Sequence, residues 1–504
     1  MSKYFILAFI FLINFFLASK MILAGDFFFL ADQARDFILT KDIITRDHFV
    51  LIGTHSGLGG FFHGPLWLYM LVPFYFLGGG NPFTFTYFYI AISVLTVIAG
   101  YFAASRLYDY KVGLLTAFLL ALSPSIWGTV PNTIGVNMVP LVYIAMFYFL
   151  IKYIRGDKFS YIFAVFFAGL ALQFETALPL IILPLVAVTF FLNKKAVKDI
   201  KLILLSIASF LLSISTFILF DLRHNFLMTR SLAGFVSGGE KESGYMELSQ
   251  RILTHASSLA SIYRSLPIST HILLLVTAAL IVVISLYLLK KDNDKKRLKE
   301  WLYLALFPVF VMVLYLGYAY PVWPEYLLGL SIPIAFAFAI SLNKVLQHKK
   351  LMLLPALFII LSLTFAGQNI KAPYGKNLSS GSYQRQIEVV EYIFKDAKDE
   401  KLTYFVYTPH TYTYSMDYLF EYLGEKKYGY IPQSNKSEST YLILYPQLSG
   451  DEGAHIFWKE NVINTQSSPS ASIEFESGIV VEKIDLSSDT ENLDPNYHQD
   501  LIFR

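Results

Sequence analysis

Long apolar segments dominate this 504-residue chain and constrain its fold more than any other feature. A transmembrane helix needs roughly 20 consecutive, mostly apolar residues. Eleven segments approach that requirement: 4–24, 83–104, 112–130, 138–151, 159–174, 178–192, 202–220, 271–289, 301–320, 325–342 and 351–367. The pattern predicts a polytopic, all-α membrane protein with about eleven transmembrane helices.

Composition agrees with this interpretation and excludes several other classes. Apolar residues make up 55% of the chain and charged residues only 15%, whereas ordinary soluble domains carry about 25% charge. A cytosolic enzyme and a disordered protein are therefore excluded. The formal charge of +3 is too small to indicate nucleic-acid binding. The chain has no cysteine, which rules out disulfides and thiol catalysis.

Basic residues predict the orientation of the helices. The first apolar segment is interpreted as a retained helix, because Lys20 and Met21 offer no signal-peptidase site. With the N-terminus in the cytoplasm, a series of basic residues between the segments falls on the cytoplasmic side. These residues are Lys3, Arg106, Lys111, Lys152, Arg155, Lys158, Lys194, Lys195, Lys198, Lys201, Lys290, Lys291, Lys295, Lys296, Arg297, Lys299, Lys344, Lys349 and Lys350. The opposite short loops, 131–137, 175–177 and 321–324, contain no Lys or Arg, as the positive-inside rule requires.

The C-terminal part has a different composition and is expected to be a separate domain. We divide the chain into a transmembrane domain, 1–368, and an extracytoplasmic domain, 369–504. Alternating runs at Leu402–Tyr407 and Tyr441–Tyr445 predict strands. The segment Tyr383–Lys395 predicts an amphipathic helix. An odd number of spans places this small α/β domain outside the cell.

Polar residues in the connecting segments gather on the predicted outer side. The first outer loop spans 25–82 and a second long one spans 221–270. The candidate site residues on this side are Asp32, Asp36, His63, Asn132, Asn137, Gln173, Glu175, Arg223, His224, Glu325 and Tyr326. Polar groups near a membrane are costly and often functional. Their common side predicts an outer-facing polar cavity.

Asp32 and Asp36 are the most informative of these candidates. On a helix they would share one face, where they could act as a base with a helper or bind a divalent cation. The alternative is a helix-capping role, since Asp is favoured in a first turn. Apart from a possible divalent cation at these two carboxylates, the sequence indicates no metal or other cofactor.

The stretch Gly53–Pro65 contains five glycines and His63 but lacks a Walker lysine or a helix-opening GxGxxG, so nucleotide binding is not supported. Glycine here is expected to permit turns or close backbone approach. His63 is open to three interpretations: an acceptor, a metal ligand or an interfacial histidine. The segment Leu66–Leu77 is too short to span and is expected to lie in the interface.

Glu175 and the Arg223–His224 pair are further candidates for a function. A carboxylate at the C-terminal end of a helix opposes the helix dipole, which favours a function for Glu175. Arg223 suits a phosphate because its guanidinium forms bidentate hydrogen bonds. The structural alternative for Arg223 is contact with lipid headgroups.

Several short motifs occur in an order that resembles the GT-C superfamily of polytopic glycosyltransferases, in particular the family 39, dolichyl-phosphate-mannose-protein mannosyltransferase-like group. The matching segments are Asp32-Gln33, His63-Gly64-Pro65-Leu66, Asn132 to Asn137, Ala171 to Ala177, and Asp221-Leu222-Arg223-His224. The likeness covers about residues 1–345. Many members have Asp-Glu where this chain has Asp32-Gln33, so Asp36 would have to supply any second carboxylate.

The resemblance implies an inverting transferase that uses a polyprenyl-phosphate-linked sugar and no nucleotide sugar. Asp32 matches the family's catalytic aspartate. The acceptor would be a glycan, lipid or protein hydroxyl on the outer face of the membrane. Arg223 and His224 are then candidates to hold the donor phosphate, because the leaving phosphate gains negative charge.

Three other functions remain as alternatives. A lipid-linked oligosaccharide ligase or polymerase would share an outer-face site. A lipid-sugar transporter or flippase is disfavoured because no internal repeat is visible and charges avoid mid-span positions. A non-catalytic scaffold would scatter these polar residues.

Overall fold

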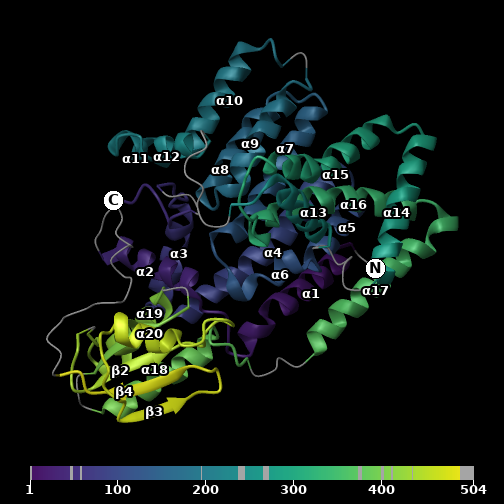
Figure 1. Ribbon diagram of the computed structural model, residues 1–504. Coiled ribbons are helices and arrows are strands. Elements are labelled where there is room, and N and C mark those ends of the chain that lie inside the picture. Colours follow the sequence, from purple (N-terminus) through teal and green to yellow (C-terminus); the bar gives the residue numbers. More distant parts are fainter. Residues whose placement is uncertain are drawn as a thin grey trace. The chain divides into compact units, whose positions relative to one another are not determined.

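The computed structural model describes residues 3–45, 49–56, 60–193, 196–236, 245–264, 272–372, 377–398, 402–409, 412–433 and 435–487. Figure 1 shows long helices and a small sheet. The chain divides into two compact units. The helical unit comprises Met1–Lys20, Val50–Trp67 and Tyr87–Ala372, and the mixed unit, with helices and a sheet, comprises Met21–Phe49, Leu68–Thr86 and Pro373–Arg504.

Seven helical segments of the described chain are long and apolar enough to cross a membrane. They are α1 (Lys3–Leu23), α4 (Pro82–Leu107), η2 with α7 (Gly135–Met138 and Val139–Ile154), α14 (Ile272–Lys291), α15 (Lys295–Tyr315), η4 with α16 (Pro324–Leu330 and Ser331–Leu346) and α17 (Leu353–Lys371). Each coincides with one of the predicted segments, so these seven predictions of an apolar helix are confirmed.

The other four predicted segments form broken or shorter helices. α5 (Tyr110–Ala121) is followed by α6 (Pro124–Trp127) and η1 (Val130–Asn132) with a bend of 58°. α10 (Ile200–Ser213) and α11 (Ser215–Arg223) meet with a bend of 67°. α8 (Ser160–Leu170) with η3 (Ala171–Gln173), and α9 (Ala177–Phe190), are shorter apolar helices. The described residues thus contain seven helices that are long and apolar enough to span a membrane, or up to nine if each bent pair is one span.

Proline explains the first of these breaks. Ser123, which precedes Pro124, has an extended backbone with φ −72° and ψ 119°. The proline ring disfavours helical geometry in the preceding residue, while proline itself is well suited to the first turn of a new helix. The chain therefore ends α5 at Ala121 and begins α6 at Pro124.

The remaining helices are shorter and lie between or after the apolar ones. They are α2 (Ala31–Thr45), α3 (Leu66–Gly78), α12 (Leu227–Val236), α13 (Leu248–Arg264), η5 (Lys349–Leu351), α18 (Tyr383–Ala397), α19 (Tyr414–Leu423), the π-helix η6 (Gly424–Tyr428) and α20 (Ala454–Asn461).

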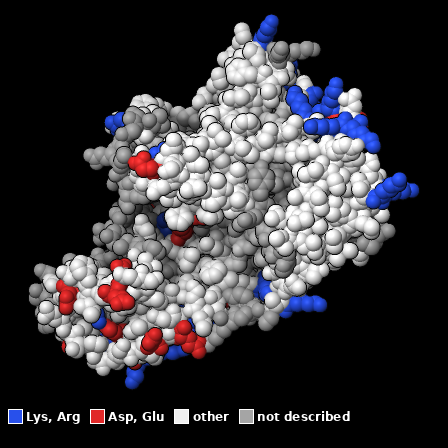
Figure 2. All heavy atoms as spheres, turned by 45° about the vertical axis from the view of Figure 1, so that its right-hand side comes forward, with Lys and Arg blue, Asp and Glu red and all other residues white. Residues whose placement is uncertain are grey.

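Basic residues mark the ends of several helices in the helical unit. Arg106, Lys152 and Lys344 lie in the last turns of α4, α7 and α16, where a cation complements the helix dipole. In Figure 2 the helices present a broad uncharged surface, and Lys and Arg gather at its margins. An uncharged surface of this breadth is expected of helices that face lipid.

A buried ion pair connects two of these helix ends, those of α4 and α7, to the start of α15. Arg155 donates from Nε to Glu300 Oε1 at 2.7 Å and from Nη2 to Glu300 Oε2 at 2.9 Å. It also donates to the backbone oxygen of Leu107, and its guanidinium lies 4.9 Å from the centre of the Tyr108 ring. Glu300 is only 1% exposed. One residue thus connects the end of α4, the end of α7 and the start of α15.

A four-stranded sheet forms the core of the mixed unit. The strands are β1 (Thr403–Tyr407), β2 (Thr440–Leu444), β3 (Ala471–Glu474) and β4 (Val480–Ile484), in the order β1-β2-β4-β3. β1 and β2 are parallel, with Phe405 opposite Leu442, and the other two pairings are antiparallel. The predicted strands at 402–407 and 441–445 and the predicted helix at 383–395 are confirmed as β1, β2 and α18.

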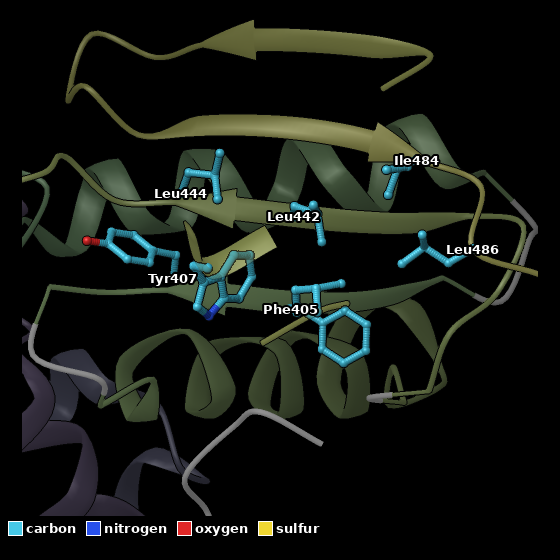
Figure 3. Close-up of a cluster of buried hydrophobic side chains, with 8 residues drawn as sticks. Phe405, Tyr407, Leu442, Leu444, Ile484 and Leu486 are labelled. Carbon is cyan, nitrogen blue, oxygen red and sulfur yellow. The ribbon is translucent and has the colours of Figure 1, made fainter. Parts of the chain in front are cut away.

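Helices cover β1 and β2 on both faces. Figure 3 shows Phe405, Tyr407, Leu442 and Leu444 on one face, where Trp458 of α20 packs against them. On the opposite face, Phe420 of α19 stacks on Tyr404 at 4.0 Å. Every residue of β1 and β2 is buried, as expected for strands that lie between two helical layers.

The mixed unit also includes part of the first predicted outer loop. Phe37 of α2 stacks on Phe85 at 3.8 Å and packs against Tyr418 of α19 at 5.7 Å. The Tyr418 hydroxyl donates to the backbone oxygen of Gly80 at 2.6 Å. The expected boundary at residue 368 divides the chain by sequence, whereas the compact unit joins 21–49 and 68–86 to the C-terminal part. Aromatic packing between distant segments explains this grouping.

Candidate functional site

Asp32 lies in the first turn of α2, and its carboxylate is paired with Arg35. The backbone N–H of Leu30 donates to Gln33 Oε1 at 3.1 Å, so Gln33 acts as a helix cap. Arg35 Nη1 lies 2.7 Å from Asp32 Oδ1. The Asp32 side chain is still 55% exposed. It is therefore both oriented and accessible.

Asp36 shares the same arginine but is buried. Arg35 donates from Nη2 to Asp36 Oδ1 at 3.0 Å, and the Asp36 side chain is 3% exposed. Burial lowers the pKa of the Arg35 guanidinium, but the carboxylates of Asp36 and Asp32 outweigh burial and raise that pKa above its ordinary value. The predicted shared helical face is confirmed, and Arg35 neutralises much of the repulsion between the two carboxylates.

Asp26, the first carboxylate of this segment, has a structural role. It accepts hydrogen bonds from the Ser382 hydroxyl at 2.8 Å, from Asn377 Nδ2 at 3.2 Å and from the backbone N–H of Phe27 at 2.8 Å. Asp26 is fully buried. It fastens the start of the first predicted loop to the C-terminal segment within the mixed unit.

In the helical unit, His63 ends a short hairpin. Its backbone N–H donates to the Thr54 oxygen at 2.9 Å, and its Nδ1 lies 3.4 Å from Thr176 Oγ1. A Cβ on Gly64 would lie 2.1 Å from Gln173 Oε1, and one on Gly53 would lie 2.4 Å from the Gly64 oxygen. The expectation that glycine permits close approach is confirmed at these two positions. Gly57 and Gly59 lie outside the described residues.

Glu175 is 2% exposed and accepts backbone N–H groups from Ala177 at 2.6 Å and Leu178 at 3.0 Å. These are the first N–H groups of α9, so Glu175 stabilises the start of that helix. The dipole of the preceding helix favoured a function for Glu175, but the helix that follows provides a structural role for this carboxylate. Burial raises the pKa of the Glu175 carboxyl to about 7, against the effect of its backbone partners, and the nearby Glu325 charge adds to the increase.

Gln173 and Asn137 also have defined partners. Gln173 Nε2 donates to the Ser213 oxygen and to Thr216 Oγ1, both at 3.1 Å, which connects η3 to the bend between α10 and α11. Asn137 Oδ1 accepts the backbone N–H of Ile134 at 2.9 Å. Asn132, at the end of η1, is exposed.

The Asp221-Leu222-Arg223-His224 motif lies at a sharp turn. Asp221 accepts the backbone N–H groups of Met228 at 2.7 Å and Thr229 at 3.0 Å, at the start of α12. His224 stacks on Phe220 at 4.1 Å, and Phe220 in turn meets Phe62 at 5.6 Å. The structure therefore brings this motif next to the His63 hairpin.

Arg223 differs from its neighbours because its side chain is exposed and forms no ion pair or hydrogen bond with the described residues. Asn225 and Phe226 follow it with positive φ values of 53° and 60°. This geometry is strained for a bulky residue such as Phe226. The turn presents an unpaired guanidinium that can bind an anion.

Glu325 and Tyr326 lie at the start of η4. Glu325 is exposed, and it interacts electrostatically with Glu175. The sequence argument missed Tyr143 and Tyr315, two buried residues whose side chains also interact electrostatically with Glu175. Their hydroxyls have no hydrogen-bond partner among the described residues. The only feature of the sequence that could have pointed to Tyr143 and Tyr315 is that each is a tyrosine within an apolar segment.

Two groups of candidates therefore result, one in each unit. Asp32 and Asp36 belong to the mixed unit, and the other nine belong to the helical unit. Within the described ranges, no group of three or more His, Asp or Glu side chains could hold a metal ion.

Comparison with known proteins gives the fold class. No protein family matches the sequence, and no curated protein matches it. Among solved structures, the chain is similar to ArnT from Cupriavidus metallidurans bound to undecaprenyl phosphate, with a TM-score of 0.56 at 11% identity over 95% of this chain and 97% of that chain. The apo state of ArnT gives the same TM-score and coverage at 12% identity.

The chain is also similar to the archaeal oligosaccharyltransferase AglB from Archaeoglobus fulgidus, with a TM-score of 0.46 at 10% identity over 97% of this chain and 75% of that chain. The similarity to ArnT shows that this chain shares the ArnT fold, which here is mostly helical, with several apolar helices and a small C-terminal sheet domain. The expected fold class is thus confirmed.

Proposed function

We propose that the chain is an integral-membrane inverting glycosyltransferase of the family 39-like group. It transfers a sugar from a polyprenyl-phosphate-linked donor to a hydroxyl of a glycan, lipid or protein acceptor. The observation that carries this proposal is the similarity in fold to ArnT bound to undecaprenyl phosphate over almost the whole of both chains. A lipid donor keeps its tail in the bilayer, so the enzyme needs no nucleotide-binding domain.

Asp32 is proposed as the catalytic base. In an inverting transfer, a carboxylate takes the proton of the acceptor hydroxyl while that oxygen attacks the anomeric carbon. Its 55% exposure leaves the carboxylate open to an acceptor, and the 2.7 Å contact with Arg35 orients it. Asp36 is the weaker candidate because it is buried against the same arginine.

Arg223 and His224 are proposed to bind the donor phosphate. The leaving phosphate gains negative charge during transfer, and a cation stabilises that charge. Arg223 suits this role because its guanidinium is exposed and has no partner among the described residues. Seven other polar residues of the helical unit are proposed to contribute to substrate binding: His63, Glu175, Gln173, Asn132, Asn137, Glu325 and Tyr326.

The proposed location is the cell membrane, with the N-terminus in the cytoplasm and the C-terminal domain outside. The basic residues at the ends of α4, α7 and α16 support this orientation. The buried Arg155–Glu300 pair would then lie at the cytoplasmic side.

The test uses purified protein, a membrane extract and radiolabelled polyprenyl-phosphate sugars. The Asp32→Asn variant should lose transfer by about 100-fold or more, whereas Asp42→Asn, on the same helix, should retain it. Near-normal transfer by Asp32→Asn would remove Asp32 from the site. Arg223→Ala should raise the KM for the donor, and Arg230→Ala, another exposed arginine nearby, is its matched control.

The same experiment separates the alternatives. Consumption of only diphosphate-linked oligosaccharides would identify a ligase or polymerase. Movement of a labelled lipid across the bilayer without transfer would identify a flippase.

A further inference from the structure

A groove lies at the carboxyl ends of β1 and β2 in the mixed unit, and none of the residues assigned above lines it. We call it the strand-end groove. Its volume is about 570 Å³, and it is lined by residues 406–409, 450–454, 457, 458 and 462. This volume falls within the roughly 300–1,000 Å³ range of small-molecule sites.

The topology of the sheet accounts for the groove. After β1 the chain continues into α19, which packs on the face with Tyr404. After β2 the chain continues into α20, whose Trp458 packs on the opposite face with Phe405. The two connections therefore leave neighbouring parallel strands toward opposite faces. Such a switch point opens a crevice at the carboxyl ends of strands, where α/β proteins bind ligands.

The loop between β2 and α20 shapes one wall of the groove. Gly450 and Gly453 have positive φ values of 97° and 99°, a conformation that glycine adopts without strain. Between them, the side chains of Asp451 and Glu452 are exposed and form no ion pair or hydrogen bond with the described residues. The loop thus presents two carboxylates that are free to accept hydrogen bonds.

The other walls are aromatic. Phe457 is 65% exposed, although it is a large apolar side chain in the groove. Figure 3 shows Tyr407 at the carboxyl end of β1 with its hydroxyl pointing away from the buried cluster. Thr408 adds a second hydroxyl to the lining. The groove therefore combines an exposed ring face with carboxylate and hydroxyl groups.

The charges of the lining indicate the ligand class. No Lys or Arg is among the described residues that line the groove, whereas Asp451 and Glu452 are, so an anionic ligand would be repelled. A sugar ring has an apolar C–H face for Phe457 and hydroxyl donors for the two carboxylates. We propose that the strand-end groove binds an uncharged glycan, which serves as the acceptor of the transfer. The acceptor role rests on the proposed function, but glycan binding does not.

The test measures binding by calorimetry to the full chain in lipid nanodiscs. The probes are a neutral tetrasaccharide, a uronic-acid tetrasaccharide and a tetralysine peptide. Only the neutral glycan should bind, and Phe457→Ala should weaken its binding about tenfold. The control is Ile456→Ala, because Ile456 is 59% exposed on the same helix but does not line the groove. Asp451→Asn should weaken binding less than Phe457→Ala, since an amide oxygen still accepts a hydrogen bond.

The transfer reaction provides a second readout. Phe457→Ala should raise the KM for the acceptor and leave the KM for the donor unchanged. Tighter binding of tetralysine than of the neutral glycan, or glycan binding that is equal in Phe457→Ala and wild type, would overturn the proposal. Phe457-dependent glycan binding by a protein that transfers no sugar would uphold the groove and refute the proposed function.

Discussion

The Arg155–Glu300 pair gives the sharpest test of how the helical unit is held together. Glu300 is 1% exposed, and two charge-assisted hydrogen bonds of 2.7 and 2.9 Å join it to Arg155. Such bonds contribute about 1.5–3 kcal/mol each. Removing one partner also leaves the other charge buried, which costs about 3–5 kcal/mol in all. Because Arg155 is 21% exposed, we expect Glu300→Gln to destabilise the protein by about 3 kcal/mol.

A double-mutant cycle measures this coupling. Arg155→Gln, Glu300→Gln and the double variant are compared by equilibrium unfolding in mixed micelles, with tryptophan fluorescence as the signal. The matched control is the Lys152–Asp157 pair, which has a similar distance of 2.9 Å but side chains 38% and 43% exposed. Its coupling energy should be below about 1 kcal/mol. Equal coupling energies for the two pairs would refute the argument that burial makes the Arg155–Glu300 pair important.

Three further predictions follow from individual residues. Burial raises the pKa of Glu175 from 4.5 to about 7, so the stabilising contribution of this carboxyl is present below pH 4.5 and is lost as the pH rises through 7. Glu175→Gln should remove on the order of 3 kcal/mol of this pH dependence, measured as unfolding free energies from pH 4 to 8. Tyr315→Phe removes a buried hydroxyl that has no hydrogen-bond partner among the described residues, so this variant should stabilise the protein by about 1 kcal/mol. Tyr303→Phe loses a 2.9 Å contact between the Tyr303 hydroxyl and Thr189, so it should destabilise the protein by about 1 kcal/mol in the same unfolding measurement. The chain has no cysteine, so single introduced cysteines report the orientation. A membrane-impermeant maleimide should label Ser472→Cys in intact cells and Lys350→Cys only after permeabilisation. The reverse result would overturn the proposed orientation.

Local patterns predicted much of the fold because they record burial directly. Runs of apolar residues long enough to span a bilayer predicted α1, α4, α14 and the other apolar helices, since backbone groups in lipid must be satisfied within the helix. Alternation and periodicity likewise predicted β1, β2 and α18. These signals depend only on residues close together in the chain.

Capping roles were partly visible in the sequence. Asp32 lies in a first turn, as one interpretation expected, and Gln33 caps the same helix. Glu175 was misjudged because its carboxylate stabilises the helix that follows it rather than the one that precedes it. A dipole argument needs both neighbouring helices, and the exact start of α9 is not evident from an apolar run.

Contacts between distant segments could be established only by the tertiary structure. Asp26 bonds to Ser382, more than 350 residues away, and Phe37 packs on Tyr418, so residues 21–49 join the C-terminal part in one unit. The strand-end groove likewise depends on the opposite directions in which α19 and α20 leave the sheet. The sequence by itself determined which segments are apolar, helical or extended, because those properties are set by neighbouring residues. Only the tertiary structure decided which polar groups are paired, buried or open, because that depends on partners far away in the chain.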